Sequence, residues 1–486
     1  MESLNSILFF YEMKFPGRLP PLLLTVGLLT VYGLTLAPGL TWAHRGADGG
    51  DLIAAAATGG VPHPTGYPTY LLLARLFQFL PVGTLAFRTN LLSALAAALA
   101  AALVYGLVKR ASQNTLAAVL SGLAFGLSPL LWSQAVITEV YALHAFFVAL
   151  ILYLSLREPG PDPALGLSFG LAMGNHVTSI FLLPLVFAAP NRSSLLRRLA
   201  WTGAGLLTYL ALPLRALTNP PVNWGNPVTL KNFLWLATGQ LYRDELLALT
   251  RSALAARLQS AAALLRDQFG LAGLALSLLG LIFYFRRSRL HRNTIWIAAV
   301  FFVFATVYST DDSYLYLLPL VLSFSVWLGL GVDGLMDALT SPRKEPLPPR
   351  DKKMAWMFGL LALTYLLALA ASHFPRMDAS HDARAEQFGE MVMAQMPADT
   401  IVFAKGDEAV FALWYFHYAM KERPDLAVIA EDLLAFDWYR QTLKETYPSL
   451  DVGGPYPFPE AVAAKNPDRP ACFVEYLERT WIRCDP

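Results

Sequence analysis

The stretch that decides the fold is RTNLLSALAAALAAALVYGL, residues 88–107, which is followed closely by Lys109 and Arg110. Residues 89–108 carry no charged side chain. A helix of about 20 apolar residues is long enough to cross the ~30 Å hydrocarbon core of a bilayer. The stretch therefore predicts a transmembrane helix, and the basic pair after it predicts that this end lies in the cytoplasm.

Similar apolar runs recur through the first three quarters of the chain. We expect further spans at 20–37, 114–132, 139–156, 163–175, 177–189, 199–217, 270–286, 294–309, 313–335 and 354–373. Of the 486 residues, 55% are hydrophobic and only 15% are charged, against about 25% charged in soluble domains. The net charge of +2 gives no reason to expect a nucleic-acid partner. The sequence predicts an α-helical polytopic membrane protein.

Basic residues are concentrated in alternate connections between the expected spans. They are Lys14, Arg18, Lys109, Arg110, Arg157, Arg192, Arg197, Arg198, Arg286, Arg287, Arg289, Arg292, Arg343, Lys344, Arg350, Lys352 and Lys353. If all are cytoplasmic, the N-terminus is cytoplasmic and the number of spans is odd. Eleven spans fit, with 163–189 counted as two because a single span would invert the side of the Arg192 to Arg198 cluster. A bacterial inner or cell membrane is the expected location.

This topology divides the chain into a membrane domain, residues 1–373, and an extracytoplasmic domain, residues 374–486. It also places two large loops outside, residues 38–87 and 218–269, the second with amphipathic stretches at 230–237 and 253–265. In the tail, short apolar runs predict strands at 400–403 and 426–429, with helices at 411–420 and 438–447. The tail is therefore expected to be a small α/β domain. Its two cysteines, Cys472 and Cys484, fit either a disulfide or two free thiols.

The first outer loop contains an acidic pair, Asp48 and Asp51, at the start of an alanine-rich stretch. In a helix, residues three apart share a face, so both carboxylates are expected at its first turn. One interpretation is a capping box, in which the two residues satisfy the helix N-terminus. The other is a general base that accepts a proton from a substrate hydroxyl. The spacing is compatible with both.

Other polar residues occur at the outer ends of the expected spans. His63 lies between two prolines in the first outer loop, and Arg215 lies in LPLRA at the end of the seventh span. Ionisable groups near a membrane are costly unless they line a polar site or reach the interface, and Arg215 also fits simple snorkelling. The remaining residues on this face are Glu139, Asn175 and His176. A cation among carboxylates beside lipid suits a lipid phosphate with a hydroxyl acceptor, or an anionic solute. No nucleotide-binding loop or zinc-ligand spacing occurs.

Several of these motifs together resemble one family of membrane proteins. They are Asp48-Gly-Gly-Asp-Leu-Ile-Ala-Ala-Ala, His63-Pro-Thr-Gly-Tyr-Pro, Glu139-Val-Tyr141-Ala-Leu, Gly174-Asn-His, Leu212-Pro-Leu-Arg215, Asn219-Pro-Pro-Val-Asn223-Trp224-Gly-Asn226-Pro, Gly406-Asp-Glu, Leu413-Trp-Tyr and Arg423-Pro-Asp. The family, long catalogued as a domain of unknown function, includes an animal protein O-mannosyltransferase that acts on plexin-type receptors. It is similar to the GT-C class of glycosyltransferases. The family's usual glutamate is here Asp51, its serine is Gly49, and its second proline is Thr65.

The resemblance implies a lipid-linked sugar donor, such as a polyprenyl-phosphate sugar, and an acceptor hydroxyl of a protein or glycan outside the cytoplasm, with an essential acidic residue at Asp48. The leading hypothesis is an inverting transfer. It places Asp48 as general base, with Asp51 orienting the site or helping to bind a divalent cation such as Mg or Mn. Arg215 and His63 are expected at the donor phosphate, and Glu139, Tyr141, Asn175, His176, Asn223 and Trp224 along the substrate cavity. The alternatives are a transporter or flippase of a lipid-linked saccharide, or a scaffold without catalysis. The sequence names neither the sugar, the lipid carrier nor the acceptor.

Overall fold

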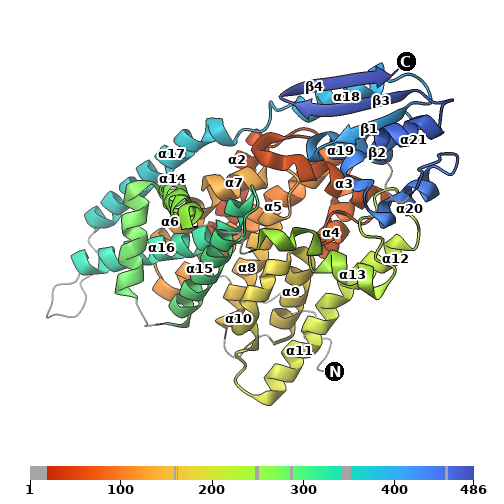
Figure 1. Cartoon of the computed structure of the whole chain (residues 1–486). Helices are drawn as coiled ribbons and strands as arrows, with labels where there is room; N and C mark the ends of the chain where they lie inside the picture. The colour runs from red at the N-terminus through yellow and green to blue at the C-terminus, as the bar shows by residue number, and fades with distance from the viewer. Residues whose placement is uncertain are drawn as a thin grey trace.

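The structure, a computed structural model, describes residues 19–157, 160, 162–246, 251–284, 288–340, 352–454 and 458–485. Its membrane part is a bundle of helices (Figure 1). The helices are α2 (Leu19–Thr35), α5 (Leu85–Ser112), α6 (Thr115–Gly126), α7 (Pro129–Ala135), α8 (Tyr141–Ser155), α9 (Asp162–Asn175), η3 (Val177–Leu182), α10 (Leu183–Phe187), α11 (Arg192–Leu206), η4 (Leu207–Leu210), α12 (Ala211–Ala216), α14 (Arg251–Phe283), α15 (Arg289–Val307), η6 (Ser313–Leu317), α16 (Leu318–Thr340) and α17 (Lys352–Met377). Every expected span overlaps one or more of them. The basic residues Lys14, Arg18, Arg286, Arg287, Arg343, Lys344 and Arg350 lie outside the described residues.

By length and composition, five helices in the described ranges can cross a membrane on their own. They lie at 85–112, 253–283, 289–307, 313–339 and 356–377. A sixth span results if α6 and α7, which meet at a 61° bend, count as one. The chain is therefore an integral membrane protein, whereas the count of eleven spans stays a prediction. The expected loop helix at 253–265 is instead the first part of α14, which bends at Gly270 (φ 60°).

Small residues allow neighbouring helices to approach closely where lipid gives no hydrophobic reason for them to associate. Gly170 on α9 packs directly on Gly205 of α11, and a Cβ on Gly170 would lie 2.8 Å from the Cα of Gly205. The alanine-rich α5 is buried along most of its length between α2, α6 and α8. The stretch that predicted the first clear span is thus the central helix of the bundle.

The C-terminal domain is built on a four-stranded sheet of order β2-β1-β3-β4. The strands are β1 (Ile401–Lys405), β2 (Ala427–Ala430), β3 (Ala471–Leu477) and β4 (Arg479–Asp485), and the helices are α18 (Arg384–Gln395), α19 (Asp407–Trp414), α20 (Asp437–Thr446) and α21 (Pro459–Lys465). β1 is parallel to β2 and β3, and β4 is antiparallel to β3. The α/β pattern and the first two strands are as predicted, within two residues at each end.

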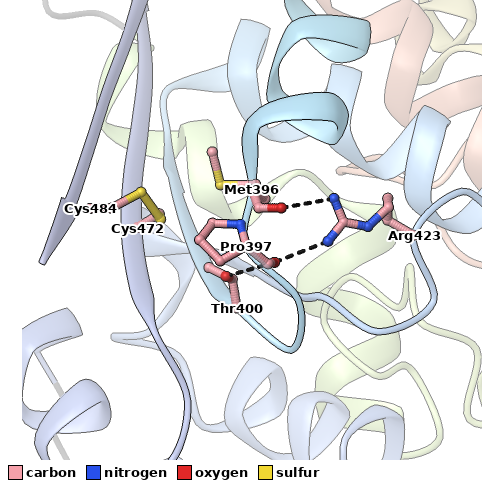
Figure 2. The surroundings of a disulfide bond; sticks show 6 residues. All are labelled: Met396, Pro397, Thr400, Arg423, Cys472 and Cys484. Carbon is pink, nitrogen blue, oxygen red and sulfur yellow. Dashed lines mark hydrogen bonds between the residues drawn. A yellow bond between two sulfur atoms is a disulfide. The ribbon is translucent and has the colours of Figure 1, made fainter. Parts of the chain in front are cut away.

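A disulfide joins Cys472 to Cys484, which lie opposite each other on β3 and β4. Of the two states that the sequence allowed, the structure has the bonded one. Figure 2 shows Arg423 nearby, with its guanidinium bonded to the carbonyls of Met396 and Pro397, each at 3.0 Å. The disulfide fixes the edge strand to the sheet, and Arg423 fixes the connection after α18.

The two outer loops lie between the bundle and the C-terminal domain. The first contains η2 (Ala43–Asp48), α3 (Gly49–Thr58) and α4 (Pro68–Gln78), and the second contains α13 (Leu230–Ala237) and η5 (Gln240–Glu245). Figure 1 shows the blue C-terminal domain lying against α3, which α19 and the helical turn η7 (Tyr415–Ala419) that follows it contact. Residues from all three regions therefore meet at one end of the bundle.

Candidate active site

Asp48 lies at the junction of η2 and α3, in the N-cap position, but its side chain makes no capping hydrogen bond. The capping-box interpretation is therefore wrong, because Asp48 already has helical backbone angles and accepts no hydrogen bond from the first turn of α3. The side chain of Asp48 is 40% exposed, and its Oδ2 lies 3.5 Å from Nε2 of His63. Asp48 thus presents a largely free carboxylate to the space around it.

Asp51, by contrast, is fully buried and has three donors. Its Oδ2 accepts hydrogen bonds from the backbone N–H of His63 at 2.9 Å and from Nδ1 of the same residue at 2.6 Å. Its Oδ1 accepts one from Nε1 of Trp224 at 3.2 Å. A buried carboxylate is stable only when its oxygens are bonded in this way. Asp51 therefore holds His63 and Trp224 in place and has little capacity left for a ligand.

The loop that carries His63 is held by the second outer loop. The N–H of Val61 donates a hydrogen bond to the carbonyl of Val222 (2.8 Å), and the carbonyl of Val61 accepts one from the N–H of Trp224 (3.0 Å). A tight turn follows, in which the N–H of Gly66 (φ 82°) bonds to the carbonyl of His63 at 2.9 Å. Only glycine adopts such a φ without strain. The imidazole is consequently fixed between the two carboxylates.

The charge of His63 follows from this position. Burial alone would lower its pKa, but the nearby carboxylates of Asp48 and Asp51 outweigh burial and raise the pKa to about 10. His63 is therefore an imidazolium at neutral pH. Burial in turn raises the pKa of Asp48, and the imidazolium opposes this increase. One side of the site thus has a fixed cation beside an accessible carboxylate.

Three more of the expected residues lie on a neighbouring wall. A chain of ring contacts leads from His63 through Tyr67 (5.1 Å) and His176 (6.3 Å from Tyr67) to Tyr141 (5.6 Å from His176). Oε2 of Glu139 accepts a hydrogen bond from the N–H of Val140 at 3.2 Å.

The amide of Asn175 closes the same wall. Its Nδ2 donates to the carbonyl of Val140 at 3.2 Å. Within the described ranges, its buried Oδ1 has no hydrogen-bond partner. Polar residues at the first, third and fifth connections between the expected spans thus lie close together.

Arg215 is less closely attached. Its Nη1 donates to the carbonyl of Gly60 at 3.1 Å, three residues before His63. In the part of the chain that the structure describes, Arg215 has no ion pair with the acidic residues. Its contact with a lipid phosphate stays a prediction. Asn223 lies near Asn226, with 3.5 Å between Nδ2 and Oδ1, on the loop that positions Trp224.

Sequence reasoning missed two acidic residues. Asp312 accepts a hydrogen bond from the hydroxyl of Tyr141 at 2.8 Å, and its charge acts on Asp48. It lies in the short outer connection after α15, so the same topology argument would have found it. Asp407 begins α19 and also belongs to this charged group. Its motif was noted, but the sequence does not show that α19 reaches the first loop.

The residues do not fit the divalent cation considered for Asp48 and Asp51. Both oxygens of Asp51 accept from N–H groups, and the His63 cation lies between the two carboxylates. A shared metal ion would require these contacts to break. Among the described residues, no group of three or more His, Cys, Asp or Glu side chains is arranged to hold a metal.

Comparison with known proteins gives the relationship. The protein-family model described as "Protein O-mannosyl-transferase TMEM260 N-terminal domain" matches residues 48–191. A second family model, "TMEM260-associated domain 2", matches residues 385–454. The chain is similar to the TMEM260 proteins. It is 28% identical over 463 residues to mouse protein O-mannosyl-transferase TMEM260, covering 87% of this chain and 64% of the mouse protein. For the Dictyostelium discoideum protein the identity is 23%, with 89% and 59% covered. The chain thus spans less than two thirds of either TMEM260 protein.

Two solved structures share the fold of this chain. ArnT from Cupriavidus metallidurans, bound to undecaprenyl phosphate, has a TM-score of 0.63 with 14% identity, and 94% of this chain and 93% of ArnT are covered. The Archaeoglobus fulgidus oligosaccharyltransferase has a TM-score of 0.54 with 13% identity, and 95% and 70% are covered. At these identities the likeness shows the fold alone.

Proposed function

We propose that this chain is a GT-C glycosyltransferase that transfers a sugar from a polyprenyl-phosphate donor to an extracytoplasmic hydroxyl, with inversion at the anomeric carbon. The TMEM260 relatives are named protein O-mannosyl-transferases, so mannose and a polypeptide hydroxyl are the first substrates to test. The observation that carries the proposal is the unequal pair of aspartates, one free and one fully bonded, on either side of His63.

In this mechanism Asp48 is the general base. Its exposed carboxylate accepts the proton of the acceptor hydroxyl while that oxygen forms a bond to the anomeric carbon. The bond from that carbon to the donor phosphate breaks on the opposite face, which inverts the configuration. The polyprenyl phosphate leaves with the bonding electrons and carries the developing negative charge.

The leaving phosphate needs positive charge nearby. His63 is a cation at neutral pH because of its two carboxylate neighbours. Arg215 holds the same loop through Gly60 and lies at the outer end of its helix, where lipid headgroups are expected. Preorganised charge at the leaving group is worth about 10²–10³ in rate. We assign donor binding to Arg215 and His63.

An extracytoplasmic location for the C-terminal domain is part of the proposal. It is supported by the Cys472–Cys484 disulfide, because disulfides persist in oxidising compartments. It is also supported by Arg110, Arg197 and Arg198, which contact Leu156 and Asp162 at the ends of α8 and α9 that lie away from Tyr141 and Asn175. The acceptor would then reach Asp48 from outside, between the membrane domain and the tail.

The test is Asp48→Asn in the purified full chain, with labelled polyprenyl-phosphate mannose and a threonine peptide. Loss of the general base should lower the transfer rate about 10²–10⁴-fold. Asp468→Asn is a matched control, since Asp468 is an exposed aspartate of the tail and should leave the rate unchanged. Equal rates for Asp48→Asn and the unaltered chain would remove Asp48 from the mechanism. Movement of the donor across vesicle membranes without product would favour a flippase instead.

A further inference from the structure

Helix α19 of the C-terminal domain is packed directly onto the acidic loop. The carbonyl of Phe411 occupies the space in which Gly50, between the two aspartates, would carry a Cβ. The ring of Phe411 stacks on the imidazole of His63, with 6.2 Å between centroids and 17° between planes. It also meets the indole of Trp224 at 6.3 Å. The C-terminal domain therefore forms one wall of the site.

Asp407 lies on the same face of α19 as Phe411, because residues four apart in a helix are neighbours on its surface. It is the first residue of the helix, one turn away from the ring that stacks on His63. Its side chain is exposed, so a ligand can reach it. Asp407 thus stands at the open side of the contact between α19 and the acidic loop.

The position of Asp407 in the sheet is also one where ligands bind. β1 ends at Lys405, and Gly406 (φ 80°) turns the chain into α19. β2 and β3 pair with opposite sides of β1. The connections that follow β1 and β2 therefore lead to opposite sides of β1, although the three strands are parallel. In sheets with parallel strands, ligands bind at the carboxyl ends of strands next to such a switch. Here α19, which begins at that edge, contacts η2 and α3, the two elements that meet at Asp48.

Ionisable groups of both the membrane domain and the C-terminal domain lie around Asp407. They are the carboxylates of Asp48, Asp51 and Glu408, the imidazolium of His63 and the phenol of Tyr242. Enclosure between the domains and the charge of Asp48 raise the pKa of Asp407 to about 6, and His63 opposes this. The wall thus offers several hydrogen-bond acceptors and one cation that is already paired. Such a surface selects ligands that supply N–H or O–H donors.

We propose that Asp407 is a specificity-determining residue that binds the acceptor next to its reacting hydroxyl. The proposal rests on the proposed function and deepens it by naming the acceptor class. The preferred acceptor is a polypeptide whose reacting hydroxyl has neutral or basic neighbours. An acidic neighbour is rejected, because it would place another negative charge between Asp48 and Asp407. The C-terminal domain is then part of the catalytic site and does more than tether the acceptor.

The experiment compares three peptides of one length, each with a single threonine flanked by glycine, lysine or aspartate. Transfer from polyprenyl-phosphate mannose is measured as kcat/KM with the full chain in detergent. The unaltered chain should prefer the lysine peptide over the aspartate peptide. Asp407→Asn should reduce that preference roughly five- to tenfold, as expected for one charge at a partly exposed site. Asp407→Glu keeps the charge and should keep the preference.

Glu390→Gln is the charge-matched control, because Glu390 is an exposed carboxylate on α18. It should leave the preference unchanged, and thermal unfolding of each variant checks that the domain is intact. An unchanged preference in Asp407→Asn, with normal transfer to the glycine peptide, would overturn the assignment of Asp407 alone. Absence of transfer to all three peptides by the unaltered chain would instead overturn the proposed function.

Discussion

Two buried charge clusters at opposite ends of the bundle use carboxylates differently. Near the basic connections, Asp162 accepts hydrogen bonds from Arg197 (Nη2, 2.8 Å) and Arg198 (Nε, 2.7 Å), which join α9 to α11. At the other end, Asp51 is saturated in the same way, but its neighbour Asp48 has one contact, 3.5 Å to His63. In the first cluster both oxygens of Asp162 are bonded to arginines, one of them buried and one half-exposed. The second has one free member.

The difference shows which buried charges are available for chemistry. A carboxylate whose lone pairs are all occupied contributes structure, since the desolvation cost is offset by its partners. A carboxylate with an open oxygen can accept a proton from a ligand. Charge alone would not distinguish Asp162 from Asp48, whereas the exposed fraction of the side chain (4% against 40%) and the number of occupied oxygens do.

We call Asp48, Asp51 and His63 the outer cluster. The largest effect is expected from Asp51→Asn, which removes the charge of its fully hydrogen-bonded aspartate. The amide cannot accept from both the N–H and Nδ1 of His63 while also accepting from Trp224, and the imidazolium loses its main partner. Removing one partner of a buried pair costs about 3–5 kcal/mol. Thermal unfolding in detergent should show this loss, and sugar transfer should fall more than a hundredfold.

Asp51→Glu is the matched variant, because it restores the residue that is usual in the family and keeps the charge. It should retain more of both stability and transfer than Asp51→Asn. If the two variants behave alike, the charge of Asp51 is not what holds His63.

We call Asp162, Arg197 and Arg198 the inner cluster. A substitution there should lower stability without lowering activity. Asp162→Asn leaves the buried Arg198 without its carboxylate, so unfolding should become easier by about 3 kcal/mol. Transfer per folded molecule should stay at the level of the unaltered chain, since Asp162 has no contact with the outer site. Measurement of both quantities on one preparation checks this. A loss of transfer beyond the loss of folded protein would show that the clusters are coupled.

The sequence predicted much of this arrangement because its signals are local. The apolar run of α5 and the basic residues beside it predict a span and its direction, and the same topology brings Asp48, Glu139 and His176 to one face. The bonding of each carboxylate was not predictable. One partner of Asp51 is Trp224, 173 positions away, and nothing near Asp51 in the sequence indicates it.

The contribution of α19 was missed for the same reason. Docking of Phe411 on His63 depends on the absence of a side chain at Gly50, where the family usually has a serine one position earlier and a glycine here. Sequence spacing within the tail cannot show which of its helices faces the membrane domain. The capping interpretation of Asp48 failed because α3 continues a preceding helical turn, which the spacing of the acidic pair does not reveal.

A pH series should distinguish the clusters by their cations. The folded-state pKa of His63 is raised to about 10, above its unfolded value of about 6.5. Its stabilisation is therefore fully present below pH 6.5 and is lost as the pH rises through 10. The stability difference between the unaltered chain and His63→Gln should shrink over this range by roughly 2 kcal/mol, less than the full shift because the three groups titrate together.

The inner cluster provides the control for this series. Its cations are arginines, which stay protonated throughout that range. The difference between the unaltered chain and Asp162→Asn should therefore be constant from pH 6.5 to 10. A parallel decline in both differences would mean that the pH effect is general and does not come from His63.

The smallest effect is expected from Trp224→Phe, which removes one of the three hydrogen bonds to Asp51 and keeps an aromatic ring. Such a bond to a charged acceptor is worth about 1.5–3 kcal/mol, but the two bonds from His63 remain. We expect transfer to fall about three- to tenfold, with the fall appearing in kcat. Trp414→Phe is the matched control, because Trp414 packs 6.2 Å from Trp224 while its buried Nε1 has no partner among the described residues. If both variants lose transfer equally, aromatic packing matters there and the bond to Asp51 does not. If only Trp224→Phe does, the second outer loop acts on the site through a single indole N–H.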